Sequence, residues 1–423
     1  MRIILNKLDA ALDDPEFVAA HRYRPQDFSR QRSLTFRHMA LFFLSGAVPS
    51  LQFGMDKLFR GLTKDRSAAA PTKQAISKAC RKFPYEALVG LQQQAVKTFY
   101  DEHPAQRWMG YRLVAVDGTK VRLPLSDDLA EEFGTQGNQT KTQRPMALLV
   151  SQQDVLTRVP LSCELAPVRM GERFLAERLL SGLSTEDLAL YDRGFPSFAL
   201  FAAHRHAKVD FCARLPKNFN TQVCRFIASG QAETVIHWTP TAKMRRDCAA
   251  LEVCDRPMEL RLIRVALNDG QVEILATNLL DTEQYPIHLF KPLYSERWGV
   301  EESYKSFKAW LGVERFRTRD RLNVYQEIYA RFLTLTLASM SAALSQPVAR
   351  QMTAHRTRDY RINFRATILK FREQFHALWR SQDPLASVLE LLAWVVRDQE
   401  MIRPGRSNPR KSKHVNPLPG MAS

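Results

Sequence analysis

The sequence lacks the features that mark secreted and zinc-binding proteins. Its 423 residues include only six cysteines, and no two of them form a C-x2-C pair. Residues 1–18 contain four carboxylates, where a signal peptide would need an uninterrupted apolar stretch. We therefore expect reduced cysteines in a protein that stays in the cytoplasm, without disulfides or a zinc site.

Long apolar runs are also missing. Met39–Val48 is short, and Phe332–Leu344 continues toward its N-terminal side into Arg331 and Glu327. Because a bilayer-spanning helix needs about 20 mainly apolar residues, both segments are predicted to be buried helices, and no membrane partner is expected.

Acidic residues are few relative to basic ones. The chain has 44 Asp and Glu against 61 Lys and Arg, a net charge of +17 and an isoelectric point near 9.8. This balance favours a polyanionic partner, with nucleic acid ahead of a membrane surface. A soluble basic protein without such a partner has the same balance. The length allows on the order of two or three domains.

Residues 1–105 are predicted to form a helical DNA-binding region. Apolar residues recur at helical spacing in Phe36–Phe53 and Tyr85–Tyr100. Between them, Pro71–Phe83 begins with Pro and Thr and carries four basic side chains. A short basic helix of this kind can enter a DNA groove, and it is equally typical of a solvated surface helix.

Residues 106–215 and 291–345 are predicted to form one α/β domain. Short strands rich in Val and Leu come first, and helices and strands then alternate. The expected order is strands at Arg112–Gly118, Lys120–Pro124 and Met146–Gln152, a helix at Arg173–Leu183, a strand at Leu188–Tyr191, a helix at Pro196–Ala207 and a strand at Val209–Arg214. Such an order fits a mixed sheet covered by helices.

Two further regions complete the predicted organisation. Residues 216–290 are expected to be a β-rich insertion, with strands at Thr221–Ile227, Thr234–Trp238, Ala249–Val253, Met258–Ala266 and Val272–Asn278. Residues 346–423 are expected to be a helical C-terminal region with a basic tail. No acidic residue follows Glu400, and this composition predicts disorder in solution and contact with phosphates.

The segment Leu293–Gly312 places four polar groups on one stripe of a predicted helix. At about 100° per residue, Arg297, Glu301 and Lys308 fall with Tyr294 within a stripe about 60° wide. Pro292 is suited to the first position of this helix. Arg297 and Glu301 are also spaced for an ordinary surface salt bridge, so this segment alone identifies no site.

Two aspartates are predicted at the carboxyl ends of buried strands. Asp117 follows Leu113–Val116, and Asp192 follows Leu188–Tyr191. Ligands gather at this edge of α/β sheets, although either aspartate could instead form a turn or cap a helix.

If these aspartates converge with Glu301, their mutual repulsion requires neutralising cations. Hard oxygen ligands suit Mg²⁺ or Mn²⁺, and a pair of such ions can cleave a phosphodiester. Arg297 and Lys308 would then neutralise phosphate charge beside the metals.

The same residues resemble a known family. Four of them match Y-x2-R-x3-E-x6-K, the signature of the DDE transposases of bacterial insertion sequences, family four: Tyr294, Arg297, Glu301 and Lys308. Asp117 in VAVDGTKVRLP and Asp192 in LYDRGFPS resemble the first and second catalytic aspartates of that family. The resemblance runs from about Arg112 to Ala330, and the tail RPGRSNPRKSK is also similar, whereas the N-terminal region matches more loosely.

The resemblance implies a ribonuclease-H-like catalytic domain that cuts element ends and joins the freed 3′-hydroxyl to target DNA. It implies that Asp117 touches both of two metal ions, and that Asp192 and Glu301 each bind one. The implied phosphate-binding residues are Tyr294, Arg297 and Lys308. The expected partners are the terminal inverted repeats, the target DNA and a second copy of the chain, on the bacterial nucleoid.

One position departs from the family. Members that form a hairpin intermediate can stack a flipped base on a tryptophan in a strand before the signature helix, and this chain has Glu273 at about that place. Trp238 and Trp298 are alternatives, and either is equally typical of a core residue. Two other functions fit the same basic chain: a non-catalytic DNA-binding relative and a metal-dependent nuclease without strand transfer.

Overall fold

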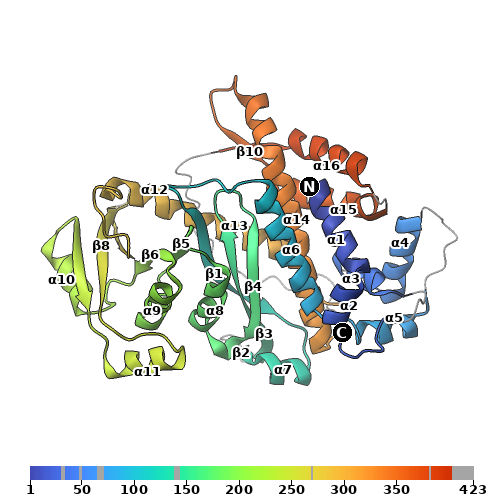
Figure 1. Ribbon diagram of the computed structural model, residues 1–423, viewed down its shortest axis with the longest axis horizontal. Coiled ribbons are helices and arrows are strands. Elements are labelled where there is room, and N and C mark those ends of the chain that lie inside the picture. The colour runs from blue at the N-terminus through green and yellow to red at the C-terminus, as the bar shows by residue number, and fades with distance from the viewer. Residues whose placement is uncertain are drawn as a thin grey trace.

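A nine-stranded mixed sheet forms the centre of the protein (Figure 1). The computed structural model describes residues 1–29, 34–46, 50–63, 71–137, 143–267, 270–380 and 383–402. The strands are β1 Arg112–Arg122, β2 Thr135–Gly137, β3 Gln143–Asp154, β4 Pro160–Pro167, β5 Asp187–Tyr191, β6 Asp210–Leu215, β7 Glu233–Trp238, β8 Met258–Ala266 and β9 Val272–Thr277. Their order is β2-β3-β1-β5-β6-β9-β8-β7, and β4 pairs with β3.

The first part of this sheet has the topology expected for the catalytic domain. β1, β5 and β6 are parallel neighbours, β3 is antiparallel to β1, and β4 is antiparallel to β3. The predicted ribonuclease-H-like mixed sheet is therefore confirmed. The strands expected at Arg112–Gly118 and Lys120–Pro124 are one strand, β1, because β3 pairs along its length from Val114 to Arg122.

Both faces of the sheet are covered, which explains why its central strands are almost continuously apolar. Val116 and Tyr191 pack against α8 (Glu172–Leu179) and α9 (Phe198–Ala207) on one face. Leu113 and Leu190 face the opposite core, which includes α12 (Phe290–Ser295) and α13 (Gly299–Trp310). Alternate residues of a strand thus enter different cores.

The region 216–290 contains helices as well as strands. β7, β8 and β9 confirm three of the predicted strands, and β9 pairs with β6, so these strands extend the main sheet. The strands expected at Thr221–Ile227 and Ala249–Val253 are wrong, because α10 (Thr221–Ser229) and α11 (Ala242–Ala250) cover these residues. The Asn220 side chain caps α10 by accepting from the Val223 N–H at 2.9 Å, which favours helix.

The N-terminal region is helical, as its periodicity predicts. Its helices are α1 Arg2–Asp13, α2 Pro15–Ala20, α3 Phe36–Leu44, α4 Leu51–Thr63, α5 Lys73–Cys80 and α6 Glu86–Glu102. The helical spacing over Phe36–Phe53 falls on two helices, α3 and α4, and the chain leaves α3 through Gly46, whose φ is +96°. In α5, the basic helix predicted within Pro71–Phe83, Ile76 and Cys80 are buried.

A long helix, α14 (Arg321–Thr353), runs beside α6 and β4 (Figure 1). Its length and composition would allow it to cross a membrane, but 67% of its most apolar window is buried within the protein. Three shorter helices and a small two-stranded sheet complete the described chain: α7 Asp127–Phe133, α15 Phe364–Arg380, α16 Leu385–Arg397, β10 Tyr360–Ile362 and β11 Gln399–Met401. The predicted basic tail, residues 403–423, lies outside the described residues.

Candidate active site

Two parallel strands place Asp117 and Asp192 next to each other. β1 and β5 pair in register up to Val116 opposite Tyr191, so the two aspartates are the next residues on adjacent strands. Neighbouring strands lie about 4.8 Å apart. Since Val116 and Tyr191 face the core of α8 and α9, alternation directs both aspartates to the opposite face, where α12 and α13 pack.

The sequence pattern predicts that Asp117 ends its strand, and this prediction is wrong. β1 continues to Arg122 because its other edge pairs with β3, where Asp117 lies opposite Ser151. Only the parallel pairing with β5 stops at Val116. Asp117 therefore lies where a parallel strand pair opens, and its Oδ1 accepts from the Gly118 N–H at 2.8 Å.

The signature segment is not one regular helix. α12 begins at Phe290, two residues before Pro292, so the prediction that Pro292 occupies the first position is wrong. Proline is tolerated in the first turn because the N–H groups there have no partner within the helix. A 3₁₀ turn, Glu296–Trp298, then leads into α13.

Tyr294 and Arg297 lie beside Asp192. The Tyr294 hydroxyl donates to the Tyr191 carbonyl oxygen at 3.2 Å and to Asp192 Oδ1 at 3.4 Å. Arg297 is only 1% exposed, and its guanidinium carbon lies 5.6 Å from the centre of the Tyr294 ring. The first half of the signature thus surrounds the second aspartate.

The charges around Asp192 keep it ionised. Burial alone would raise the pKa of Asp192, but the positive charge of Arg297, a hydrogen bond from the Arg193 N–H and the charge of Arg214 together lower that pKa below its usual value. Arg214 Nη2 lies 2.5 Å from Asp192 Oδ1. A carboxylate must be ionised to bind a metal ion, so Asp192 is in the required state.

The ion pairs of Arg214 with Asp192 and Glu273 were not found by sequence reasoning. Tyr191 is opposite Ala213 in the parallel pair of β5 and β6, which brings Arg214 next to Asp192. Arg214 also pairs with Glu273, the residue expected at about the place of the family's base-stacking tryptophan. Trp238 is 5% exposed and packs edge-on against Phe198, so it is a core residue. The side chain of Trp298 lies outside the described part.

Tyr304 attaches α13 to the strand that carries Asp117. Its hydroxyl donates to the Asp117 carbonyl oxygen and accepts from the Ser151 N–H at 3.1 Å. The Ser151 hydroxyl oxygen lies 2.8 Å from the same atom. Glu301 is one helical turn before Tyr304 in α13, while the Glu301 side chain is outside the described part. Lys308 Nζ donates to the Lys120 carbonyl oxygen at 2.6 Å, further along β1.

Another carboxylate lies next to Gly118 and interacts with the charge of Asp192. Glu172, the first residue of α8, lies so close to Gly118 that a Cβ there would be 2.6 Å from Glu172 Oε1. Burial raises the pKa of Glu172, the charge of Lys120 opposes this, and Asp192 adds to it. Any side chain at position 118 would therefore force Glu172 to move, and glycine avoids this.

Comparison with known proteins identifies the family. Residues 108–337, more than half of the chain, match the family described as Transposase DDE domain. The chain belongs to this family. The transposase InsG of insertion sequence element IS4 from Escherichia coli K12 is 25% identical to this chain over 287 residues. That match confirms the resemblance to the IS4 group, family four of the DDE transposases.

The matches cover only part of each relative. The alignment with InsG spans 65% of this chain and 62% of InsG. The putative transposase InsZ of the same organism is 29% identical, over 31% of this chain and 43% of InsZ. Among solved structures, a piggyBac transposase synaptic complex with hairpin DNA, determined by cryo-EM, has a TM-score of 0.44 and 8% identity. The structural alignment covers 93% of this chain and 81% of the piggyBac transposase chain.

Asp117 and Asp192 offer two of the oxygen ligands that a divalent metal would need. Asp117 and Asp192 are hard donors of the kind that suit Mg²⁺ or Mn²⁺. Within the described residues, no three Asp, Glu, His or Cys side chains come together as a metal site. The third expected ligand, Glu301, has its side chain outside the described part. The chemistry of the two aspartates therefore fits the metal that the family implies.

The Tyr304 contact gives a testable prediction for this DDE domain. Tyr304→Phe keeps the ring but leaves the buried Ser151 N–H and the Asp117 carbonyl oxygen without the hydroxyl, at a cost of about 1–3 kcal/mol in the free energy of unfolding. Urea denaturation followed by circular dichroism measures this loss. The control is Tyr23→Phe, because Tyr23 is 49% exposed. Equal stability of the two variants would show that the Tyr304 hydroxyl contributes nothing.

Proposed function

We propose that this chain is a DNA transposase that cuts the ends of an insertion sequence and transfers the freed 3′-hydroxyl strand into target DNA. The observation that carries the proposal is the register of β1 and β5. It places the two aspartates of a DDE family member on adjacent parallel strands, on the face where the signature segment packs.

Asp117, Asp192 and Glu301 are the proposed catalytic and metal-binding residues. They would hold two Mg²⁺ ions, or Mn²⁺, which when bound activate the attacking oxygen and stabilise the leaving one. The chain itself contributes the ionised state of Asp192, which Arg297 and Arg214 favour. It also contributes the position of α13, which Tyr304 attaches to the backbone of Asp117.

Tyr294, Arg297 and Lys308 are the proposed phosphate-binding residues. Tyr294 and Arg297 are buried beside Asp192, so they can reach only a phosphate that is itself at the proposed metal site. A buried guanidinium in such a position stabilises negative charge more strongly than one in water. Lys308 is less buried and lies further along β1, where it would meet a neighbouring phosphate.

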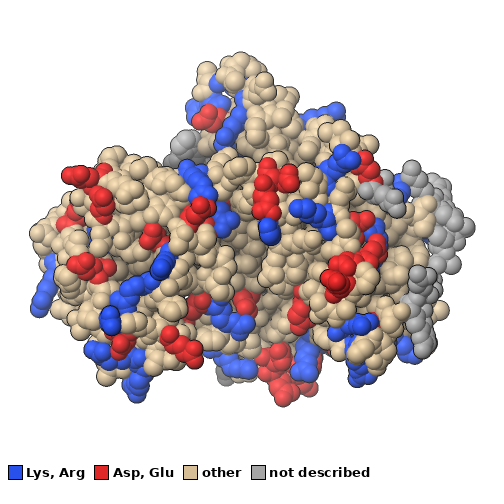
Figure 2. Space-filling model, viewed as in Figure 1, with Lys and Arg blue, Asp and Glu red and all other residues tan. Residues whose placement is uncertain are grey.

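DNA is the proposed partner, both as element end and as target. On the face in Figure 2, Lys and Arg are interspersed with Asp and Glu, so the net charge of +17 is not gathered there in one patch. Since two element ends must meet before insertion, we propose that two copies of the chain assemble on the DNA, in the cytoplasm at the nucleoid.

The test uses the purified full-length chain and duplex DNA from the inverted repeats that flank its coding region. With Mg²⁺ or Mn²⁺ we expect cutting at the repeat end and joining of that end to a target plasmid, and with EDTA neither. Cutting without joining would identify a nuclease instead. Metal-independent binding without cutting would identify a non-catalytic DNA-binding protein.

A further inference from the structure

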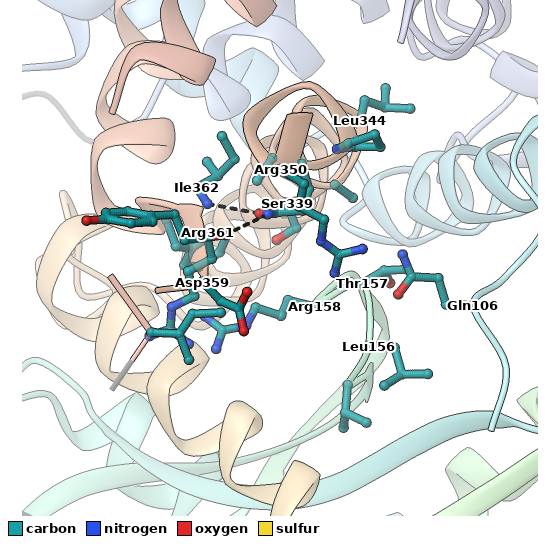
Figure 3. Close-up of a pocket in the computed structure, with 18 of the residues that line it drawn as sticks. Gln106, Leu156, Thr157, Arg158, Ser339, Leu344, Arg350, Asp359, Arg361 and Ile362 are labelled. Carbon is teal, nitrogen blue, oxygen red and sulfur yellow. Dashed lines mark hydrogen bonds between the residues drawn. The ribbon is translucent and has the colours of Figure 1, made fainter. Parts of the chain in front are cut away.

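A cavity of about 970 Å³ lies away from the aspartates, beside the second half of α14. Its other walls include the turn between β3 and β4, the segment that leads into β10 and the segment that follows α6 (Figure 3). Figure 3 shows Arg350 on α14 and Arg158 in the β3–β4 turn on facing walls. The cavity thus brings together segments from distant parts of the sequence.

Arginine dominates the charge of this cavity. Two acidic residues, Glu296 and Asp359, line it together with five arginines: Arg158, Arg350, Arg356, Arg358 and Arg361. Arg361 pairs with Glu400 at 2.6 Å, and Arg356 lies over the ring of Tyr360. For Arg350 and Arg358, both exposed, the described residues provide no carboxylate within 4.0 Å.

The walls are fixed by buried polar contacts. Asp154 is fully buried, and its Oδ1 accepts from the N–H groups of Leu156 at 2.9 Å and Thr157 at 3.2 Å, which fixes the β3–β4 turn. On the other side, the Gln346 side chain donates to the Tyr360 carbonyl oxygen at 3.2 Å and accepts from the Ile362 N–H at 2.9 Å. These hydrogen bonds therefore hold in place the segments that carry the arginines.

We propose that this cavity binds the phosphate backbone of duplex DNA, at a site separate from the catalytic aspartates. Guanidinium groups donate paired hydrogen bonds to phosphate, and exposed arginines without nearby carboxylates have these donors available. Glu296 lines the cavity and directly precedes Arg297, so the bound backbone would lie next to the signature turn. The proposal rests on the proposed function, because it takes DNA as the partner.

The test compares two double variants that lose the same charge. Arg350→Gln with Arg358→Gln removes two cavity arginines, and Arg225→Gln with Arg246→Gln removes two exposed arginines of α10 and α11. Fluorescence anisotropy with labelled repeat-end duplex gives the binding constant over a series of salt concentrations. The slope of log K against log salt is negative, and each lost phosphate contact reduces its magnitude by about 0.9. The cavity variant should therefore have a slope that is less steep by about 1.8.

The control should keep the slope of the unmodified chain, and the cavity variant should still cut DNA at saturating concentrations. If the cavity variant and the control have the same slope while the unmodified chain binds and cuts, the cavity proposal is overturned and the proposed function stands. If the unmodified chain does not bind DNA, both are overturned. Should the double variant unfold, the single variant Arg358→Gln, outside α14, is expected to have a slope that is less steep by about 0.9.

Discussion

The variant Asp117→Ala is expected to lose DNA cutting by at least about 10³-fold while it still binds the repeat-end duplex. Asp117 lies where the parallel pairing of β1 and β5 ends, and its carboxylate is one of two oxygen donors on adjacent strands. Without it, a metal pair would lose the ligand proposed to touch both ions. Single-turnover cutting with Mg²⁺ measures the loss, and anisotropy with the same duplex measures binding.

The matched control for this prediction is Asp247→Ala, which removes one carboxylate from the exposed surface of α11. The control should cut as the unmodified chain does. Asp117→Asn keeps the side-chain size and the acceptor for the Gly118 N–H, so it separates loss of charge from loss of shape. Cutting by Asp117→Ala at the unmodified rate would show that the proposed mechanism is wrong.

The strands around the candidate site were predictable because their residues are buried on both faces. Continuous apolar runs such as Leu113–Val116 and Leu188–Tyr191 occur where helices cover both sides of a sheet. A charged residue directly after such a run is easy to recognise in the sequence. Asp117 and Asp192 follow these two runs. The sequence pattern cannot give strand register, which depends on pairing between distant segments, so the ion pairs of Arg214 with Asp192 and Glu273 were missed.

Helical periodicity described the signature segment less well. The expected stripe assumes about 100° per residue throughout, but the 3₁₀ turn at Glu296–Trp298 has about three residues per turn. Tyr294 and Arg297 therefore lie beside Asp192, whereas Lys308 contacts Lys120 further along β1. Nothing in the local sequence marks this turn, because it depends on how the segment packs against the sheet.

The strand predicted at Thr221–Ile227 failed for a local reason. Its β-branched residues favour a strand, but Asn220 caps a helix, and the buried Val223 and Phe226 are three residues apart, which is helical spacing. The capping residue and the spacing together outweighed the intrinsic strand preference. A cap immediately before a segment is thus more informative here than its content of Thr, Val and Ile.

Replacing Glu327 with alanine is expected to lower the free energy of unfolding by about 3–5 kcal/mol. Glu327 lies in α14 between two arginines, with Oε1 3.0 Å from Arg317 Nε and Oε2 2.7 Å from Arg331 Nη2. All three side chains are at most 4% exposed. Removal of the carboxylate leaves two buried positive charges without their counter-ion. Urea denaturation followed by circular dichroism measures the loss.

The control for this prediction is Glu390→Ala on the exposed face of α16, which should change stability by less than about 0.5 kcal/mol. The triple variant Arg317→Met, Glu327→Leu, Arg331→Met removes the whole buried network, so no uncompensated charge remains. It should recover most of the stability that Glu327→Ala loses, since apolar residues can replace a buried ion network at little cost. If the triple variant were less stable than Glu327→Ala, packing and backbone contacts of the arginines, such as that from Arg331 to the Arg315 carbonyl oxygen at 2.6 Å, would outweigh the cost of burying their charge.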